Sequence, residues 1–357
     1  MGIVGLNFGR HIVDELLRAP ADELIEVVAV CDLDSSKVRE VASRTGIKAA
    51  LELQELLDDH TVEAIGLFSS PVGRAQLIRR CINAGKHVMT TKPFEVDPEA
   101  AMNVLTEARA LGLIVHLNSP SPLMTGDLKQ VLAWQSKYDL GRPIACHRST
   151  WVHHNERADG SWYDDPEMCP AAPILRLGIY CINDMVRLLG DPQEINIVQS
   201  RIFTGRPTAD NAQLGILFRN GAIGSVFASF CVNDTQFYAN SMTLNFERGT
   251  VYRNVGALPP MRGKSHRAMM SVVSAGKSGS SAIESAELED TSGQYQWKAF
   301  YLAVRGEKLT DEVTPQQIVA GVKIISALSR AQKHRTSDES EKSSSRPLEC
   351  IPSCAVT

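Results

Sequence analysis

The sequence predicts an α/β domain built on a parallel sheet, followed by an α+β domain with a large, mostly antiparallel open sheet. Strand-like apolar runs and helical stretches alternate over the first 117 residues, which is typical of repeated β-α-β units. Glycines stand at the ends of helices in that part of the chain. Beyond residue 190, extended segments follow one another without helices between them, which favours antiparallel pairing.

The predicted N-terminal domain covers residues 1–117. Its continuous apolar run at 24–31 suits a strand that is buried on both faces. Gly46, Gly85 and Gly112 stand where helices would end, and a left-handed residue is common at that position. The expected strands are 3–4, 24–31, 62–68, 87–90 and 113–117, and the expected helices are 10–18, 35–44, 72–84 and 97–112.

The predicted second domain covers residues 118–335. We expect a helix over 174–189 in a layer on one face of the sheet, and a last helix over 315–332. Gly, Ser and Pro are frequent over 256–293, which is typical of loops. The polar, Ser-rich residues 336–357 predict a disordered tail. Extended segments are expected at 195–203, 212–218, 222–232 and 236–252.

A glycine-rich turn, GLNFG at residues 5–9, lies between the first strand and the first helix. Such a turn lets the backbone approach a pyrophosphate, and the helix N-terminus stabilises its charge. The motif is an imperfect G-x-G-x-x-G, because Asn7 replaces the middle glycine and the last glycine comes one position early. A plain strand-to-helix turn is the alternative. The candidate dinucleotide-binding residues here are Gly5, Asn7, Phe8, Gly9 and Arg10.

Asp32 ends the second predicted strand, 23 residues after Gly9 (32 − 9). A carboxylate at this place accepts hydrogen bonds from a ribose 2′-OH and repels a 2′-phosphate, so Asp32 favours NAD. NADP is an alternative, since Lys37 could contact a phosphate. Asp32 or Asp34 could instead only cap the next helix. With these features the N-terminal domain is predicted to be a dinucleotide-binding Rossmann domain.

Two blocks of the sequence resemble motifs of a known family. Residues 84–93, AGKHVMTTKP, are similar to A-G-K-H-V-x-x-E-K-P. Residues 162–166, WYDDP, and 178–183, GIYCIN, resemble W-R-x-D-P…D-x-G-I-Y-C-I-N, in a branch with Tyr in place of His. Over about residues 1–336, the chain is identified as a member of the Gfo/Idh/MocA family of glucose–fructose oxidoreductase and inositol dehydrogenase.

The resemblance implies a nicotinamide-dependent oxidoreductase acting on a sugar, polyol or sugar acid between the two domains. Lys92 matches the family's catalytic lysine and Tyr180 its His/Tyr partner; such a pair exchanges the hydroxyl proton during hydride transfer. A solvated lysine and a packing aromatic residue are the alternatives. The family also suggests a cis Lys92–Pro93 bond. The same resemblance extends the dinucleotide site to Ser70, Pro71, Lys92 and Pro93.

The family resemblance further implies a homodimer or homotetramer that assembles through the open face of the second sheet. A different function is the alternative: a family member that binds dinucleotide but acts as a regulatory or partner-binding protein. The chain departs from the family at three places, and the alternative supposes that the last of them, Asp to Arg, has ended catalysis. The family's E-K-P glutamate is Thr91, its glycine triplet is 170–172 (PAA), and its active-site Asp falls at Arg176.

Arg176 and Tyr180 stand four residues apart, so they share a helix face. We expect Arg176 to face the cleft, where its charge would lower the pKa of Tyr180 and disfavour protonated Lys92. A positive pocket of this kind suits an anionic carbohydrate-like substrate. The alternative is that Arg176 pairs with Asp164 or Asp165.

Other candidates for substrate contact are weaker. Asn118 lies at the mouth of the last parallel strand, and Trp151 and His153 follow a predicted strand. Trp162 could stack on a sugar ring. No metal site is expected, because adjacent histidines at 153–154 point to opposite sides of an extended segment.

Composition excludes several classes of protein. The 37 Lys and Arg against 41 Asp and Glu give a net charge of −4, so nucleic acid is not an expected partner. No apolar run is long enough to span a membrane, and no secretory signal is recognisable, so a cytoplasmic location is expected. The eight cysteines are expected to be free thiols. Residues 354–357, CAVT, have the C-a-a-X form of a prenylation site, with an inert tail as the alternative.

Overall fold

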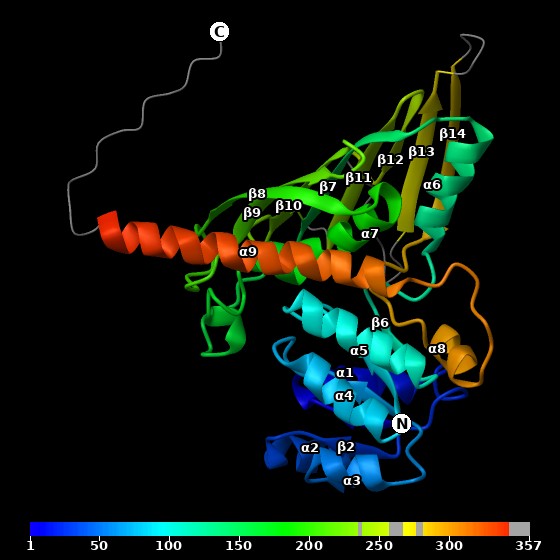
Figure 1. Ribbon diagram of the computed structural model, residues 1–357, viewed down its shortest axis with the longest axis vertical. Coiled ribbons are helices and arrows are strands. Elements are labelled where there is room, and N and C mark those ends of the chain that lie inside the picture. Colours follow the sequence, from blue (N-terminus) through cyan, green and yellow to red (C-terminus); the bar gives the residue numbers. More distant parts are fainter. Residues whose placement is uncertain (235–237, 257–266, 276–280, 343–357) are drawn as a thin grey trace.

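The computed structural model describes residues 1–234, 238–256, 267–275 and 281–342, with side chains described up to residue 330. It contains one sheet in each domain, and a long helix near the C-terminus lies against both domains (Figure 1). This arrangement confirms the predicted fold class of a Rossmann-type domain followed by a domain with a large antiparallel sheet.

The N-terminal sheet is parallel, with the strand order β3-β2-β1-β4-β5-β6. The order reverses beside β1, which is where ligands bind in sheets of this kind. The residues at 24–28 are not in the ladder, so β2 is shorter than predicted; its partner β1 offers only three residues for pairing. The strands are β1 (Gly2–Val4), β2 (Ala29–Cys31), β3 (Lys48–Ala50), β4 (Ala64–Leu67), β5 (His87–Thr90) and β6 (Val115–Leu117).

Helices cover both faces of this sheet. Side chains of α1 and α2 form one apolar core with the sheet, and those of α3, α4 and α5 form the other. The glycines at 46, 85 and 112 have φ values of 75°, 75° and 69°, which confirms the predicted helix ends. The helices are α1 (Leu6–Leu16), α2 (Ser35–Thr45), α3 (Leu53–Asp58), α4 (Arg74–Asn83) and α5 (Pro98–Ala110).

The second sheet has eight strands in the order β14-β13-β12-β11-β7-β10-β9-β8. All pairs are antiparallel except β7 with β10. Two expectations are corrected: 236–252 contains the hairpin β11–β12, and 256–293 contains β13 and β14. The strands are β7 (Pro143–Trp151), β8 (Pro192–Ser200), β9 (Asn211–Phe218), β10 (Ile223–Ser229), β11 (Ala239–Phe246), β12 (Gly249–Arg253), β13 (Arg267–Ser274) and β14 (Ala282–Glu289).

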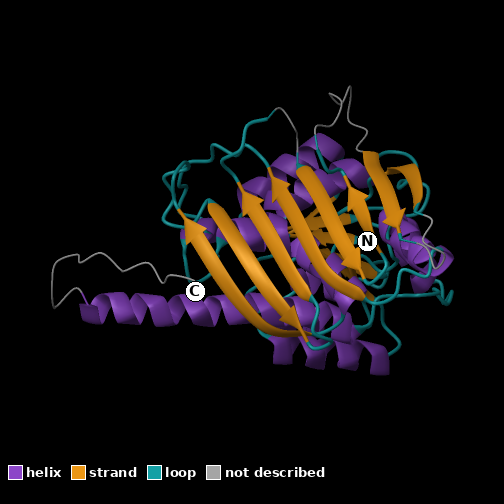
Figure 2. Cartoon of the chain, turned by 90° about the horizontal axis from the view of Figure 1, so that it is seen from above, coloured by secondary structure: helices purple, strands orange, loops and turns teal. Residues whose placement is uncertain are grey.

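One face of this sheet packs on helices, and the other is open, as Figure 2 shows. The core side holds α6 (Gly126–Lys137), a π-helical turn η2 (Ile174–Gly178) and α7 (Ile179–Leu189). The predicted helix over 174–189 is therefore present, but its first turn is π-helical rather than α-helical. This turn carries Arg176, and α7 begins just before Tyr180.

The chain returns to the N-terminal domain after the second sheet. Trp297 and Phe300 of α8 (Trp297–Val304) pack in the core beside α1. The long helix α9 (Pro315–Lys342) places Ile318 and Val322 in the N-terminal core, and Ile324 and Ile325 in the second core. It continues beyond its predicted end and through 336–342, where a tail was expected; residues 343–357, with the C-a-a-X sequence, lie outside the described residues.

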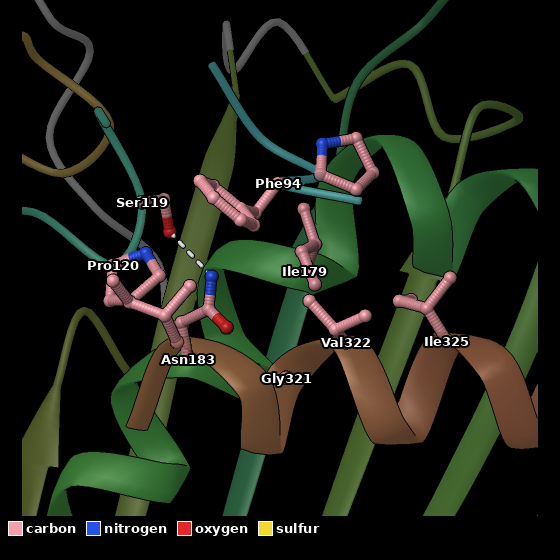
Figure 3. A pocket seen from close by; sticks show the side chains of 10 residues that line it. Phe94, Ser119, Pro120, Ile179, Asn183, Gly321, Val322 and Ile325 are labelled. Atoms are coloured by element: carbon pink, nitrogen blue, oxygen red, sulfur yellow. Dashed lines mark hydrogen bonds between the residues drawn. The ribbon is translucent and has the colours of Figure 1, made fainter. Parts of the chain in front are cut away.

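The two domains meet at α9 in a small hollow (Figure 3). Asn183 of α7 donates a hydrogen bond of 3.0 Å to Ser119, which follows β6. A Cβ at Gly321 of α9 would lie 2.3 Å from the Asn183 amide oxygen. The lack of a side chain at Gly321 thus permits the close approach of α7 and α9. The hydrogen bond from Asn183 to Ser119 fixes the loop after β6 against α7.

None of the helices in the described part of the chain is both long and apolar enough to cross a membrane.

Candidate active site

The glycine-rich turn has the shape that a pyrophosphate needs. Gly5 precedes α1 with φ 89°, and a Cβ there would lie 2.7 Å from the carbonyl oxygen of Phe68. Gly9 packs closely on the sheet, because a Cβ there would lie 3.0 Å from Ile3. The turn therefore has no side chain at Gly5, directly before the N-terminus of α1, where the helix dipole favours an anion. These residues fit a dinucleotide.

The carboxylate of Asp32 lies at this turn. One oxygen accepts a 2.6 Å hydrogen bond from the Leu6 N–H and the other a 2.8 Å bond from the Asp34 N–H. Asp34, and not Asp32, is the N-cap of α2, so the alternative of a mere cap is correct only for Asp34. The Lys37 ammonium donates to the Asn7 amide oxygen at 2.7 Å, so a cation lies at the turn together with the Asp32 carboxylate. Because the carboxylate suits the ribose of NAD and the cation suits the phosphate of NADP, both dinucleotides are compatible with the site.

Apolar side chains surround the same edge of the sheet. Leu33 follows Asp32 and is fully exposed, and Val72 and Phe8 are 48% and 43% exposed. Sites for small molecules are lined mostly by apolar side chains. Leu33 and Val72 were not among the candidates from the sequence. Arg10 is exposed as well.

Lys92 follows β5 and reaches across to the second domain. Its bond to Pro93 is cis, as expected from the family. Its ammonium donates a 2.6 Å hydrogen bond to the carbonyl oxygen of Arg176 in the π-helical turn. It also lies over the ring of Tyr180, 4.9 Å from the ring centre. The structure thus brings Lys92, Arg176 and Tyr180 together from two domains.

The surroundings of Lys92 lower the pKa of its ammonium to about 7. Burial is the largest cause, and the cations of Arg176 and Arg74 add to it, while Cys169 opposes them. Burial and neighbouring positive charge both disfavour the protonated amine. A pKa near neutrality is what a general acid and base needs, so the expected effect of Arg176 on Lys92 is confirmed.

Tyr180 is held by Asn118, the residue that directly follows β6. Asn118 donates to its hydroxyl at 3.4 Å and to the carbonyl of Gly293 at 3.0 Å. The side-chain amide oxygen of Asn118 accepts a 3.0 Å hydrogen bond from the backbone N–H of Lys92. Asn118 is buried, at 4% exposure; it braces the pair, and together with Tyr180 it lines a small hollow. Burial raises the pKa of Tyr180; our expectation that Arg176 lowers it is wrong, because desolvation dominates.

Arg176 has a partner that the sequence analysis did not identify. Its guanidinium pairs with both carboxylate oxygens of Glu156, at 2.8 and 3.2 Å. It lies over the rings of Tyr163 and Phe230, with 4.2 and 4.8 Å between Cζ and the ring centres. The expected alternative of pairing with Asp164 or Asp165 is wrong. Asp164 instead pairs at 2.7 Å with Arg206.

The remaining candidates, Trp162, Trp151 and His153, differ in how directly their contacts connect them to Arg176 and Lys92. The ring of Trp162 packs at a tilt against that of Tyr163, with 4.1 Å between the ring centres, and Tyr163 in turn contacts Arg176. Trp151 donates to Asp234, and exposed His153 packs near Phe203. Neither of these last contacts involves the Lys92 group.

The loop after β4 carries Ser70 and Pro71. Pro71 is buried and Ser70 partly exposed, and the Ser70 hydroxyl accepts from the Val72 N–H at 3.4 Å. In the described residues no cluster of His, Cys, Asp and Glu could hold a metal ion. Six cysteines are described, and all are free thiols; Cys350 and Cys354 lie outside the described residues.

Comparison with known proteins agrees with this geometry. Residues 1–119 match the model of an oxidoreductase family with an NAD-binding Rossmann fold, and residues 128–252 match the GFO/IDH/MocA C-terminal domain. The chain belongs to the Gfo/Idh/MocA family. Its N-terminal domain is the NAD-binding domain of that family.

Curated relatives of the chain are distant. Trans-1,2-dihydrobenzene-1,2-diol dehydrogenase of Macaca fuscata fuscata is 26% identical over 229 residues, which are 63% of this chain and 65% of that protein. The chain thus spans slightly less than two thirds of that relative's length. 1,5-anhydro-D-fructose reductase of Ensifer adhaerens is 23% identical over 271 residues, 73% of this chain and 77% of that protein.

Solved structures share the fold. The 3-ketoreductase KijD10 from Actinomadura kijaniata, in complex with NADP and TDP-benzene, has a TM-score of 0.71 at 18% identity, covering 91% of this chain and 95% of that one. GenD2 from gentamicin A biosynthesis, in complex with NAD, has a TM-score of 0.69 at 16% identity, covering 91% of each chain.

Proposed function

We propose that this protein is an NAD(P)-dependent oxidoreductase that acts on the CH–OH or ketone carbon of a sugar, polyol or sugar acid. When bound, the nicotinamide supplies the hydride acceptor or donor. The observation that carries the proposal is the position of Lys92, a half-buried lysine with a pKa of about 7 that lies between the NAD-binding domain and Tyr180.

Lys92 takes the hydroxyl proton in oxidation and returns it in reduction. Its neutral amine is available near pH 7 because burial and Arg176 lower its pKa. Tyr180 keeps its proton, since burial raises its pKa. It therefore serves as a hydrogen-bond donor to the substrate oxygen, and Asn118 holds it in place.

The charge around Arg176 bears on the class of substrate. Glu156 occupies the guanidinium with two hydrogen-bonding contacts, so an anionic substrate must compete with that carboxylate. The guanidinium also lies over the rings of Tyr163 and Phe230, and Phe230 is buried at 3% exposure. Neutral carbohydrate-like substrates are therefore favoured over uronates or sugar phosphates. The named relatives, which include a dihydrodiol dehydrogenase and an anhydrofructose reductase, support this class.

The test is nicotinamide absorbance with NAD and NADP against a panel of neutral and acidic sugars and diols. We expect turnover with a neutral member of the panel. Lys92→Met should lower kcat at least about a hundredfold, as loss of a general acid–base group does, while dinucleotide affinity stays within a few-fold. Lys129→Met, at an exposed lysine of α6, is the control and should change neither.

Two outcomes contradict the proposal. If Lys92→Met retains wild-type kcat, Lys92 does not exchange the proton. If dinucleotide binds tightly but no member of the panel is turned over, the alternative of a regulatory or partner-binding family member is favoured.

A further inference from the structure

Arg74 breaks two rules of local structure beside the candidate site. It is the first residue of α4, where the helix dipole disfavours a cation. It is also buried, at 1% exposure, and a buried charge is costly unless its N–H groups are bonded. Residues that break local rules without gain in their own element are expected at functional sites.

The guanidinium of Arg74 bonds to carbonyl groups of two different loops. It donates to the carbonyls of Thr91, at 2.5 Å, and of Pro93, both in the loop after β5. A longer bond of 3.3 Å reaches Phe94 in the same loop. Its other terminal nitrogen donates to the carbonyl of Ser69, in the loop after β4. One side chain therefore connects the two loops.

These loops carry candidate residues on each side of Arg74. Ser70 and Pro71 directly follow Ser69, and Lys92 lies between Thr91 and Pro93. The contacts are to backbone carbonyls, so they fix the path of the main chain on which the Lys92 side chain is mounted. A cation with a planar fork of five donors suits this task, whereas a lysine has three donors on one atom.

A buried carboxylate compensates the charge. Glu95, at 1% exposure, accepts from the Ala75 N–H at 2.8 Å at the start of α4. Burial lowers the pKa of Arg74 to about 10, and Glu95 opposes this shift. The guanidinium is therefore charged near neutral pH, and its bonds to the carbonyls are charge-assisted.

We propose that Arg74 is a positioning residue that ties the loop carrying Lys92 to the loop after β4 and so sets the place of the Lys92 amine beside the bound dinucleotide. This inference rests on the proposed role of Lys92. Arg74 also contributes, after burial and Arg176, to the lowered pKa of Lys92. Its role thus has a geometric part and an electrostatic part.

Arg74→Lys and Arg74→Gln separate these two parts. Both variants should lower kcat about tenfold to a hundredfold, since small displacements of a catalytic group have such effects, with less change in the KM of the substrate. Arg74→Lys keeps the charge, so its rate of oxidation should still rise as pH increases through about 7, where Lys92 loses its proton. Arg74→Gln loses the charge, so the pKa of Lys92 should rise and this increase in rate should move to higher pH. Melting temperature and dinucleotide affinity are measured alongside.

The matched control is Arg79→Gln on the same helix, where Arg79 pairs with Glu107 at the surface; it should leave kcat and the pH profile unchanged. Unchanged kcat and pH profile in folded Arg74 variants would overturn the inference, as would a loss of activity that follows melting temperature alone. If Arg74→Gln does not fold, Arg74→Lys decides by its split between kcat and KM.

Failure of the proposed function is a separate result. If the wild type turns over no substrate, titration of the Lys92 amine by NMR still reports on its position. A raised Lys92 pKa in Arg74→Gln then supports the inference, and an unchanged pKa contradicts it.

Discussion

Lys92 lies in surroundings that disfavour its own charge. Burial, Arg176 and Arg74 all lower the pKa of its ammonium to about 7. In oxidation the neutral amine must accept a proton, so the rate should rise as pH increases through about 7 and level off above it. In reduction the protonated amine donates, so the rate should fall through the same range. The Lys92 side chain donates to the Arg176 carbonyl at 2.6 Å.

Removing the Arg176 charge tests this electrostatic argument. In Arg176→Gln, Lys92 loses the largest of its charge-repulsion contributions, so its pKa should rise. The rising limb of the oxidation profile should move to higher pH by about one unit. The measurement is kcat/KM against pH. Arg305→Gln, at an exposed cation paired with Glu63, is the control, and an unmoved limb in Arg176→Gln would show that its charge does not reach Lys92.

For single residues, the sequence predicted the side chains of the candidate site better than the side chains that pair with them. Lys92, Tyr180 and Arg176 were identified as neighbours and lie together. Glu156 was missed because it stands 20 residues before Arg176 in an irregular stretch without periodicity. The pKa of Tyr180 was predicted in the wrong direction, since a sequence shows a neighbouring charge but not the depth of burial that outweighs it.

Among the elements, the turn from β1 to α1 is the clearest local signal of a binding function. Gly5 combines a positive φ with contact to the carbonyl of Phe68, and both restrict the position to glycine. The C-terminal glycine of α2, Gly46, also has a positive φ, but a Cβ there would have no neighbour within 4 Å. A side chain at Gly46 would therefore cause backbone strain alone, whereas a side chain at Gly5 would cause both strain and a steric clash.

Alanine at these glycines should have unequal effects. Gly46→Ala should cost about 1 kcal/mol of stability through its left-handed backbone alone, and should leave dinucleotide affinity unchanged. Gly5→Ala adds a clash with the backbone, so the turn must shift and the Kd for NAD or NADP should rise at least about tenfold. Calorimetry of binding and melting temperatures provide the measurement. Equal Kd values for both variants would contradict the assignment of the turn.

Elements with strong local signals were predicted well, such as β5 and α2, whose bounds lie within a residue of expectation. The strands β13 and β14 were missed because Gly and Ser are frequent around them, although the side chains of each strand alternate between more and less exposed positions. The role of Arg74 had no sequence signal, since its partners are backbone carbonyls in two separate loops.

Over the whole molecule, the second sheet leaves one face without helices (Figure 2). On β10, Val226 and Ala228 face the helical turn η2, so Phe227 points to the open side. Ile223 and Val198 are exposed on the same side, at 60% and 68%. Apolar side chains on an otherwise uncovered sheet suit the homodimer or homotetramer that the family resemblance implies.

A charge on this face should dissociate the assembly. Wild-type protein is expected to elute as a dimer or tetramer in size-exclusion chromatography with light scattering. Phe227→Lys places a cation on the open face and should give the monomer. Leu132→Lys, at a 40% exposed residue of α6 on the other side of the sheet, should keep the wild-type mass. A monomeric wild type would contradict the proposed assembly.

The convergence of two domains on Lys92 is the central claim, and the most direct test is an NMR titration of its side-chain amine in protein with labelled lysine. Comparison with Lys92→Arg assigns the signal. The account predicts a pKa near 7, rising when Arg176 is replaced by Gln. A Lys92 pKa near 10.4, the value of a solvated lysine, would contradict it.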